Sequence, residues 1–315
     1  MGSLDVVVVA YNSRDTVRGC VEPLAGEEDV TVIAVDNASP DDSLAAVDDL
    51  PVMAVRLPSN GGFAHGCNAG WRLGVGRYVL FLNPDARIDT VSLRRLAQVL
   101  DDEPGVGIVG PRIVDEHGML NLSIRRFPRL SSTYGQALFL HRIWPRAAWT
   151  DEVVREPERY DTSGPAEWLS GACLLVRRSL LEQLDGLDDG FFMYCEDKDL
   201  CRRTWKSGYA VQFEPGGQAV HLGGGGASSP RGQLLPGAGC EPHPLRTEAF
   251  RTHLRARRAA WHRTQQLDPR PHRPRRRLGA ARTRAGVRRI DHRHLAVWAA
   301  HLSVPMAVAA GAVRD

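Results

Sequence analysis

Four short apolar runs alternate with helix-like segments in the first hundred residues, and this alternation constrains the fold most. Each run is rich in Val, Leu or Ile and has the length of a buried strand. The runs are LDVVVVAY at 4–11, VTVIAVDN at 30–37, PVMAVRL at 51–57 and RYVLFL at 77–82. Strands that alternate with helices are typical of parallel sheets. The sequence therefore predicts an α/β fold, with a mostly parallel sheet and helices on both faces.

The segments between these runs carry helix signals. Ser13 is placed to cap a helix from about Arg14 to Ala25, and Ser39 precedes Pro40 and two acids, a strong helix start. A Gly-rich turn that enters a helix is expected in NGGFAHGCNAGWRLG at 60–74, and a further helix in TVSLRRLAQVL at 90–100.

The second hundred residues are less regular. Residues 118–165 are rich in Arg, Trp and Pro without a clear period, and long irregular segments of this kind usually serve a site. Order returns where Ser179 and Glu182 match a capping box. CEDKDLCRRTWKSG at 195–208 predicts a helix that its last glycine ends, and YAVQFEPGGQAVHLGG at 209–224 predicts a pair of strands.

Beyond residue 229 the composition changes to an irregular, basic tail rich in Arg, Pro and His. Residues 231–315 hold 18 arginines, no lysine and five acids. We expect residues 230–315 to be largely disordered. Two alternatives are an aberrant segment after a shift of reading frame, and a basic arm on anionic lipid. AVWAAHLSVPMAVAAGAV at 296–313 is interrupted by His301 and Pro305, so a membrane span is disfavoured.

Cysteine spacing and the N-terminus indicate a cytoplasmic protein. The six cysteines form no C-x-x-C pair, and a chain of 315 residues needs no disulfides to build a core, so all six are expected to be reduced. The first residues, MGSLDVVVVAYNS, place an acid before a five-residue apolar run, which is not the pattern of a secretory signal.

Several enzyme classes are excluded or disfavoured by missing motifs. The only lysines, Lys198 and Lys206, do not follow the glycines of a phosphate-binding P-loop. The glycines of 61–70 do not match the dinucleotide fingerprint, and neither a zinc spacing nor a G-x-S-x-G nucleophile motif occurs.

Polar residues follow the predicted strands at the edge where parallel sheets bind ligands. Asn12, Asp36, Asn60 and Asp85 each fall at such a carboxyl end. Taken singly, each is most often a turn residue, but four together indicate a site. Asp85, after Asn-Pro, is either a turn residue or a ligand for a hard cation that bridges to a diphosphate.

Three acids fall within four residues of CEDKDLC. Asp199 is expected to form a surface ion pair with Arg203 one helical turn later. Glu196 and Asp197 either stabilise the helix N-terminus or serve a site, one of them as a general base. His221, after a predicted strand, is structural unless a carboxylate site lies nearby.

Seven motifs in order give the chain a resemblance to the family 2 glycosyltransferases, inverting enzymes of the Rossmann-like GT-A fold. They are VVVVAYN, VIAVDNAS, NGGFAHGCNAG, YVLFLNPDA, WLSGACLLVRR, FFMYCEDKDLCRR and HLGGGGAS, between about residues 4 and 229. N-P-D in place of D-x-D is similar to the bacterial rhamnosyltransferase-like branch. The resemblance implies a glycosyltransferase domain over 1–229, with a nucleotide-sugar half over about 1–115 and an acceptor half over about 116–229.

The resemblance also implies roles for single residues. Those implied to bind the nucleotide-sugar are Tyr11, Asn12, Asp36, Asn60, Gly62, Asn68 and Asp85. Trp168, Ser170 and Gly171 would border the acceptor, and Asp85 would hold a divalent metal with His221. Asp197 would be the catalytic base, with Glu196 beside it.

The implied reaction is an inverting transfer of a sugar, L-rhamnose from a dTDP donor, with Mg²⁺ or Mn²⁺ as cofactor. The acceptor would be a hydroxyl of a cell-envelope glycan or a polyprenyl-linked glycolipid, reached by peripheral contact at the inner face of the plasma membrane. Two alternatives are an inactive relative that binds sugar nucleotides and a nucleic-acid-binding protein that uses the tail. Nucleic-acid binding is disfavoured because the tail has few aromatic side chains and the rest of the chain is acidic.

Overall fold

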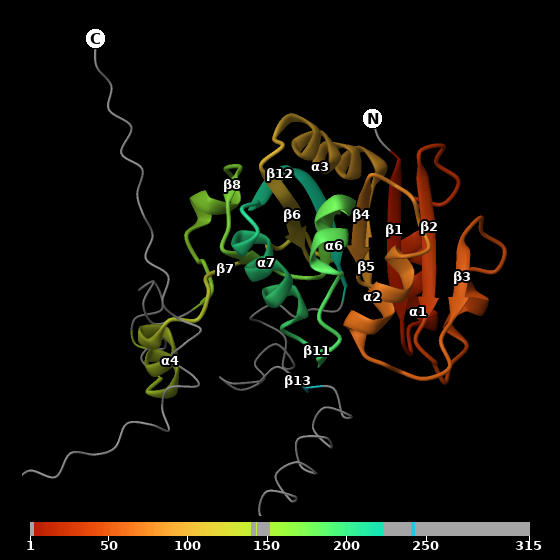
Figure 1. Cartoon of the computed structure of the whole chain (residues 1–315), viewed down its shortest axis with the longest axis horizontal. Helices are drawn as coiled ribbons and strands as arrows, with labels where there is room; N and C mark the ends of the chain where they lie inside the picture. The colour runs from red at the N-terminus through yellow and green to blue at the C-terminus, as the bar shows by residue number, and fades with distance from the viewer. Residues whose placement is uncertain (1–2, 140–142, 144–151, 223–240, 243–315) are drawn as a thin grey trace, which may run out of the picture. The chain divides into compact units, whose positions relative to one another are not determined.

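A nine-stranded sheet forms the centre of the computed structural model, which describes residues 3–139, 143, 152–222 and 241–242 (Figure 1). Its strand order is β3-β2-β1-β4-β10-β6-β12-β5, and β8 pairs with β12 beside this path. The strands are β1 (Leu4–Ala10), β2 (Val30–Asp36), β3 (Met53–Arg56), β4 (Tyr78–Leu82), β5 (Ala86–Ile88), β6 (Val106–Val114), β8 (Gly164–Pro165), β10 (Cys173–Arg177) and β12 (Ala210–His221).

Six of these strands point the same way, so the predicted, mostly parallel sheet is confirmed. β1, β2, β3 and β4 are mutually parallel neighbours, and β12 is parallel to β6. β10 runs antiparallel between β4 and β6, which therefore share one direction. The four predicted apolar runs thus end at a common edge of the sheet.

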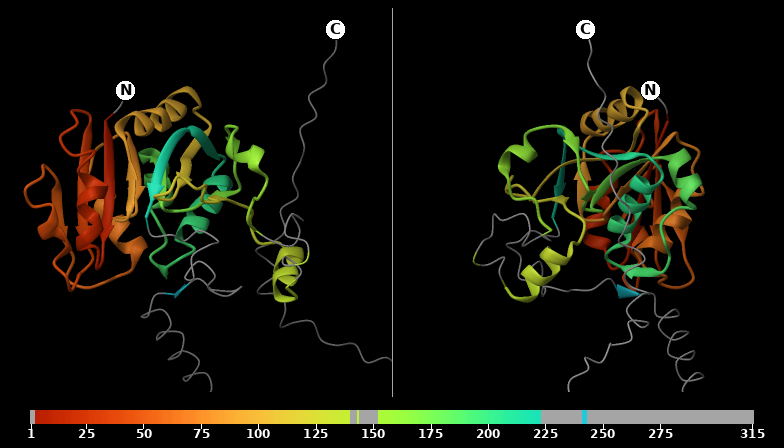
Figure 2. Two further views of the ribbon diagram at one scale, coloured as in Figure 1. Left: turned by 180° about the vertical axis from the view of Figure 1, so that it is seen from behind. Right: turned by 60° about the vertical axis from the view of Figure 1, so that its left-hand side comes forward.

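Side chains of β1 alternate between two cores, one on each face of the sheet. Leu4, Val6, Val8 and Ala10 pack with α1 (Arg14–Val21) and α3 (Thr90–Asp102). The side chains between them, Val7 and Val9, pack with the other face's helices: α2 (Phe63–Trp71), α6 (Arg178–Leu184) and α7 (Glu196–Lys206). The helices on both faces, visible in the two views of Figure 2, were predicted from the sequence.

Two predicted helix starts are wrong. No α-helix follows Ser39; the segment holds only a short 3-10 turn, η1 (Ser43–Ala46), because Asp42 before it has φ +50° and cannot continue a right-handed helix. The capping box at Ser179 is wrong as well, since α6 begins at Arg178 and no side chain caps it. Helix α1 begins as predicted but ends at Val21.

The two strands predicted over 209–224 are one long strand, β12. Its register against β6 shifts between Glu214 and Gln218, where Gly216 and Gly217 lie. This irregularity lets one strand follow β6 and then reach β5. The remaining elements are β7 (Ile124–Arg125), β9 (Trp168–Leu169), β11 (Phe191–Met193), β13 (Glu241–Pro242), α4 (Leu130–Ala137) and η2 (Pro157–Tyr160).

The predicted boundary at 229, the candidate span at 296–313 and all of the basic tail but 241–242 lie outside the described residues. In the part of the chain that is described, no helix has the length and apolar content needed to cross a membrane. Cys20, Cys67, Cys173 and Cys201 are free and buried, as expected. Cys195 is disulfide-bonded, which corrects the prediction of six reduced cysteines. Spacing along the chain does not reveal which cysteines the fold brings within bonding distance.

Candidate active site

The ends of β1 and β2 bring three predicted site residues together. Ala10 is paired with Asp36 in the parallel register, so Tyr11 and Asn12 emerge beside Asp36. Tyr11 is about half exposed, at 48%, whereas Asp36 is buried and accepts a 2.8 Å hydrogen bond from the Ser39 amide. Asn12 has φ +53°, a conformation that turns the chain sharply at the strand end. An exposed ring thus lies beside a buried carboxylate.

A residue that the sequence reasoning missed, Asn37, organises the Gly-rich turn. Its Nδ2 donates to Asn60 Oδ1 at 2.8 Å and to the Gly62 carbonyl at 3.1 Å, and its Oδ1 accepts from the Gly61 amide at 3.1 Å. Its place directly after Asp36 at a strand end was the available signal. Asn37 therefore connects the end of β2 to the turn before α2.

Gly62 joins this turn to the second half of the chain. Its φ is +90°, and a Cβ there would lie 2.3 Å from the carbonyl oxygen of Phe192 in β11. Only glycine fits so close to another backbone. Since β11 leads into α7, the contact fixes the Gly-rich turn against the segment that carries Glu196 and Asp197.

Asn68 lies in α2 and is fully occupied inside the protein. Its Nδ2 donates to the Leu187 carbonyl at 2.8 Å and to Asp189 at 2.6 Å. Its Oδ1 accepts from Trp71 Nε1 and from the Leu187 amide. These four bonds use the whole hydrogen-bonding capacity of the amide. The structure thus gives Asn68 contacts that position a loop.

Asp85 and His221, which are 136 positions apart, meet through strand pairing. β5 pairs antiparallel with the end of β12, with His221 opposite Ala86, and Asp85 Oδ1 lies 3.1 Å from His221 Nε2. Burial raises the pKa of Asp85, but the hydrogen bond and the charge of His221 outweigh it, so the pKa lies below its ordinary value. Asp85 therefore stays ionised near neutral pH.

These two side chains are the ones that could hold a metal at this edge. No cluster of three or more His, Cys, Asp or Glu side chains suitable for a metal occurs among the described residues. A carboxylate oxygen and an imidazole nitrogen suit Mn²⁺, and Mg²⁺ is commonly held by one or two carboxylates plus substrate phosphates. The donor set fits a cation that takes its other ligands from substrate.

Glu196 and Asp197, the acid pair, are the first two residues of helix α7, and two backbone amides hold the Asp197 carboxylate. Its Oδ2 accepts from the Gly171 amide at 2.8 Å and its Oδ1 from the Lys198 amide at 2.7 Å. A Cβ on Gly171 would approach Asp197 Cβ to 3.0 Å, so glycine permits this contact. Asp199, by contrast, forms the predicted ion pair with Arg203, at 2.6 Å.

Burial sets the protonation of the pair. It raises the pKa of Glu196 to about 8, and the charge of Asp197 adds to the shift. Glu196 Oε2 has no hydrogen-bond partner among the residues that the structure describes. Burial also raises the pKa of Asp197, against the opposing effects of its two amide donors and of the Arg125 and Lys198 charges. Near neutral pH the raised pKa favours the protonated form of Glu196.

The turn of Asp85 and the turn of Gly171 are direct neighbours. Leu82 at the end of β4 is paired with Cys173 at the start of β10, and the Asn83 amide donates to the Ala172 carbonyl at 3.0 Å. Asp85 lies two residues after Asn83. Gly171, whose amide binds Asp197, lies one residue before Ala172. The metal candidate and the base candidate therefore belong to one edge of the sheet.

The other predicted acceptor residues lie on β9 and just after it. Trp168 donates from Nε1 to the Arg126 carbonyl at 2.9 Å, and the Ser170 amide donates to the Ser123 carbonyl at 3.1 Å. The segment around Arg125 thus supports the turn that leads to Gly171. Sequence reasoning missed it because residues 118–165 have no clear period.

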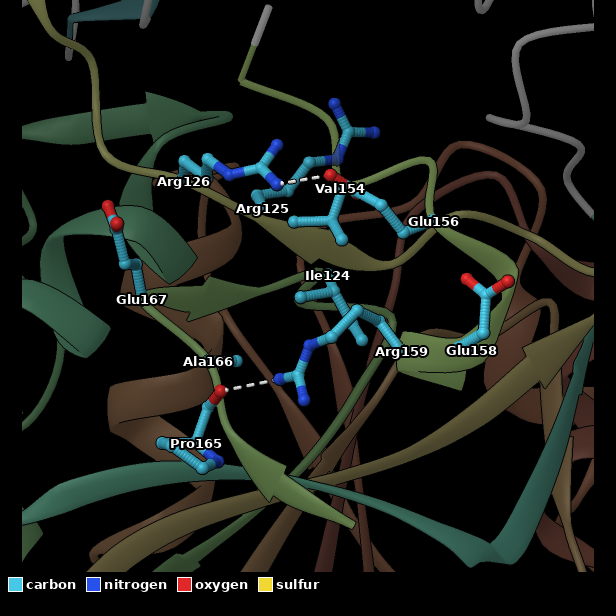
Figure 3. Close-up of a pocket in the computed structure, with 10 residues that line it drawn as sticks. All are labelled: Ile124, Arg125, Arg126, Val154, Glu156, Glu158, Arg159, Pro165, Ala166 and Glu167. Carbon is cyan, nitrogen blue, oxygen red and sulfur yellow. Dashed lines mark hydrogen bonds and ion pairs between the residues drawn. The ribbon is translucent and has the colours of Figure 1, made fainter. Parts of the chain in front are cut away.

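A pocket of about 400 Å³ lies in the same half of the chain (Figure 3). It is lined by Ile124, Arg125, Arg126, Val154, Glu156, Glu158, Arg159, Pro165, Ala166 and Glu167. Internal contacts occupy part of this lining: Arg126 pairs with Glu156 at 2.9 Å, and Arg159 donates to the Pro165 carbonyl at 2.9 Å. No residue predicted for the site lines the pocket, although Glu167 adjoins Trp168.

Comparisons with known proteins identify relatives of this chain. The chain is 32% identical over 240 residues to the N-acetylglucosaminyl-diphospho-decaprenol L-rhamnosyltransferase of Mycobacterium tuberculosis, covering 69% of this chain and 75% of that protein. It is 28% identical over 231 residues to the rhamnosyltransferase WbbL of Escherichia coli, covering 69% and 82%. The crystal structure of GalNAc-T7 with UDP, GalNAc and Mn²⁺ superimposes with a TM-score of 0.54 at 14% identity, over 70% of this chain and 43% of that one.

The last likeness concerns the fold alone, which is the GT-A glycosyltransferase fold. The family model of glycosyl transferase family 2 matches residues 5–184, which include β1 to β10 and both turns that meet at Asn83 and Ala172. The chain is thus a glycosyltransferase, and it belongs to glycosyltransferase family 2, in the rhamnosyltransferase branch.

Proposed function

We propose that this enzyme transfers L-rhamnose from a dTDP-linked donor to a hydroxyl of a polyprenyl-linked glycolipid or cell-envelope glycan, with inversion. The names of the two relatives support the sugar, and the name of the Mycobacterium tuberculosis enzyme supports an acceptor carried on a diphospho-polyprenol. One observation carries the proposal: the Asn83–Ala172 hydrogen bond joins the turn of Asp85 to the turn beside Asp197.

The nucleotide of the donor would bind across the ends of β1 and β2. Tyr11 offers an exposed ring for stacking against the base, and Asp36 a buried carboxylate that can accept a hydrogen bond from it. Asn12, Asn60 and Gly62 would line the ribose and diphosphate, in a turn held by Asn37. Asn68 would act indirectly, by holding the 187–189 loop.

Asp85 and His221 would hold a divalent cation, Mg²⁺ or Mn²⁺. The Mn²⁺ in the GalNAc-T7 structure supports a metal in this fold. When bound, such a cation stabilises the negative charge of a diphosphate leaving group. The low pKa of Asp85 suits this role, since an ionised carboxylate is needed to bind a cation.

Asp197 would be the general base. The acceptor oxygen attacks the anomeric carbon while the bond from that carbon to the diphosphate oxygen breaks, and the hydroxyl proton passes to Asp197. The amides of Gly171 and Lys198 hold this carboxylate in place. Glu196 is disfavoured as the base because its raised pKa keeps it protonated near neutral pH. A single displacement inverts the anomeric centre.

Peripheral contact with the inner face of the plasma membrane would bring the enzyme to a polyprenyl-linked acceptor. Exposed apolar side chains on and after α4 support this contact: Leu130, Tyr134, Leu138, Phe139 and Ile143. Residues 117–150 contain five arginines and no acid, a composition that favours anionic lipid. Flotation with vesicles of phosphatidylglycerol tests it; flotation unaffected by Leu130→Glu with Leu138→Glu would count against this surface.

The proposed reaction is tested with purified full-length chain, Mn²⁺ or Mg²⁺, and a short-chain polyprenyl diphosphate carrying N-acetylglucosamine. We expect transfer from dTDP-L-rhamnose and a product of inverted anomeric configuration by NMR. Donor binding without transfer to any acceptor would favour the inactive relative. Salt-dependent DNA binding without binding of any nucleotide-sugar would favour the nucleic-acid alternative.

A further inference from the structure

Two cationic side chains flank the indole ring of Trp168. Arg125 Cζ lies 5.7 Å from the ring centroid and Lys198 Nζ lies 5.6 Å from it. Arg125 reaches the ring because it is the residue opposite Trp168 in the β7–β9 pairing, and Lys198 because it follows Asp197 in the first turn of α7. Neither cation belonged to the predicted site.

The positive charge of this pair is only partly compensated. Lys198 Nζ is 3.8 Å from Glu152 Oε2, a loose ion pair. Arg125 has no carboxylate within ion-pair distance among residues 3–139 and 152–222, and its Nε is buried without a hydrogen-bond partner. A buried donor without a partner calls for an explanation, such as a bound water or ion. The charge of the guanidinium is thus not neutralised by any carboxylate among these residues.

The cations lie close to the proposed base. Both oppose the effect of burial on the pKa of Asp197, so their charges act on its carboxylate directly. Trp168 itself is three residues from Gly171, whose amide binds Asp197. An acceptor whose hydroxyl meets Asp197 would therefore bring its other groups close to these two cations.

We propose that Arg125 and Lys198, both held over Trp168, form a subsite for the phosphate groups of an anionic acceptor. The inference rests on the proposed function and adds the residues that would distinguish a diphosphate-linked acceptor from a neutral glycan. Guanidinium and ammonium groups both bind phosphate oxygens. The competing explanation is that the two cations act only on the pKa of Asp197 and bind no acceptor.

Two acceptors separate these explanations. One is N-acetylglucosamine linked through diphosphate to a short polyprenyl chain, and the other is a neutral glycoside of the same sugar and chain. We expect Arg125→Ala to raise KM for the diphosphate acceptor about 10- to 100-fold, since a charge-assisted hydrogen bond contributes roughly 1.5–3 kcal/mol. KM for the neutral acceptor and for the donor should stay within about 3-fold. Lys198→Ala should behave in the same way with a smaller effect, because Glu152 already shares its charge.

Two further variants serve as controls. Arg129→Ala removes a neighbouring, exposed arginine that pairs with Glu167, and should leave both KM values unchanged. Arg125→Lys keeps the charge and should restore most of the affinity for the diphosphate acceptor. Donor-induced thermal stabilisation of each variant shows that it is folded. Methylene diphosphonate should inhibit competitively against the diphosphate acceptor, and more weakly in Arg125→Ala.

Equal loss with both acceptors in Arg125→Ala would overturn the subsite and favour the competing explanation. An increase in donor KM would instead assign Arg125 to the donor diphosphate, and would overturn the inference as well. Both results leave the proposed transfer reaction intact. If the wild-type chain binds no nucleotide-sugar and glycosylates neither acceptor, the proposed function fails, and the subsite fails with it.

Discussion

The two halves of the described chain, residues 3–115 and 116–222, supply site residues in different ways. In the first half the candidate residues lie at strand ends or shortly after them. Asp36 is the last residue of β2, and Asp85 lies three residues after the end of β4. In the second half, the Asp197 carboxylate is held by a distant amide, that of Gly171, and burial raises the pKa of Glu196. Strand topology thus places the residues proposed for the donor, whereas tertiary packing sets the environment of the proposed base.

The largest effect is expected from Asp197→Asn. If Asp197 is the general base, kcat should fall by about 10²–10⁴-fold, the usual range for a lost general base. The donor KM should change little, because Asp197 is not among the residues proposed to bind the donor. Asp199→Asn is the matched control, since it removes a carboxylate two residues away that pairs with Arg203. A kcat near the wild-type value in Asp197→Asn would refute the assignment.

The stability of Glu196→Gln at two pH values tests whether burial raises the pKa of Glu196. The folded pKa of about 8 exceeds the ordinary value of 4.5, so the native state keeps a proton that the unfolded state releases between these pH values. Stability of the wild type should therefore fall as pH rises from about 4.5 to about 8. The variant, which does not titrate, should gain relative to the wild type by on the order of a few kcal/mol at pH 8.5.

Urea midpoints at pH 5 and pH 8.5 measure this difference. Glu182→Gln, on the neighbouring helix α6, is the control and should give the same difference from wild type at both pH values. A gain for Glu196→Gln that does not grow between pH 5 and pH 8.5 would show that Glu196 is ionised in the folded state.

Gly62→Ala tests the contact between the halves. The new Cβ would meet the Phe192 carbonyl at 2.3 Å, so one backbone must move. We expect a loss of about 1–3 kcal/mol, or a Tm lower by roughly 3–10 °C. Gly118→Ala is the control, because Gly118 also has a positive φ, +76°, but has open space around it. Equal losses at both positions would mean that backbone strain alone, without the contact, explains the glycine.

The smallest effect is expected from Asn37→Ala in the first half. The change removes three hydrogen bonds that hold the Asn60–Gly62 turn, at a net cost of about 1–3 kcal/mol. Donor KM should rise by several-fold while the acceptor KM stays the same. Steady-state kinetics with each substrate varied separately measures both; a rise confined to the acceptor KM would contradict the division between the halves.

The sequence predicted the strands of the first half because their signals are local, although the helix expected after Ser39 was wrong. Apolar runs gave β1, β2, β3 and β4, and their polar ends gave Asp36 and Asp85. The insertion of β10 between β4 and β6 was not predictable, since an antiparallel strand in a parallel sheet leaves no periodic signal. Arg125 and Lys198 were missed because their contacts with Trp168 join segments that are distant in the chain, whereas Asn37 had a local signal in its place after Asp36.

The central claim, that Asp85 serves the donor side and Asp197 the acceptor side, is tested most directly by one thermal-shift measurement. Wild type, Asp85→Ala and Asp197→Asn are each melted with dTDP-L-rhamnose, with and without Mn²⁺. Donor at about 100 times its Kd should stabilise the wild type by roughly 2.7 kcal/mol, and only when Mn²⁺ is present. Asp197→Asn should keep this stabilisation and Asp85→Ala should lose it. Full stabilisation of Asp85→Ala, or its loss in Asp197→Asn, would contradict the account.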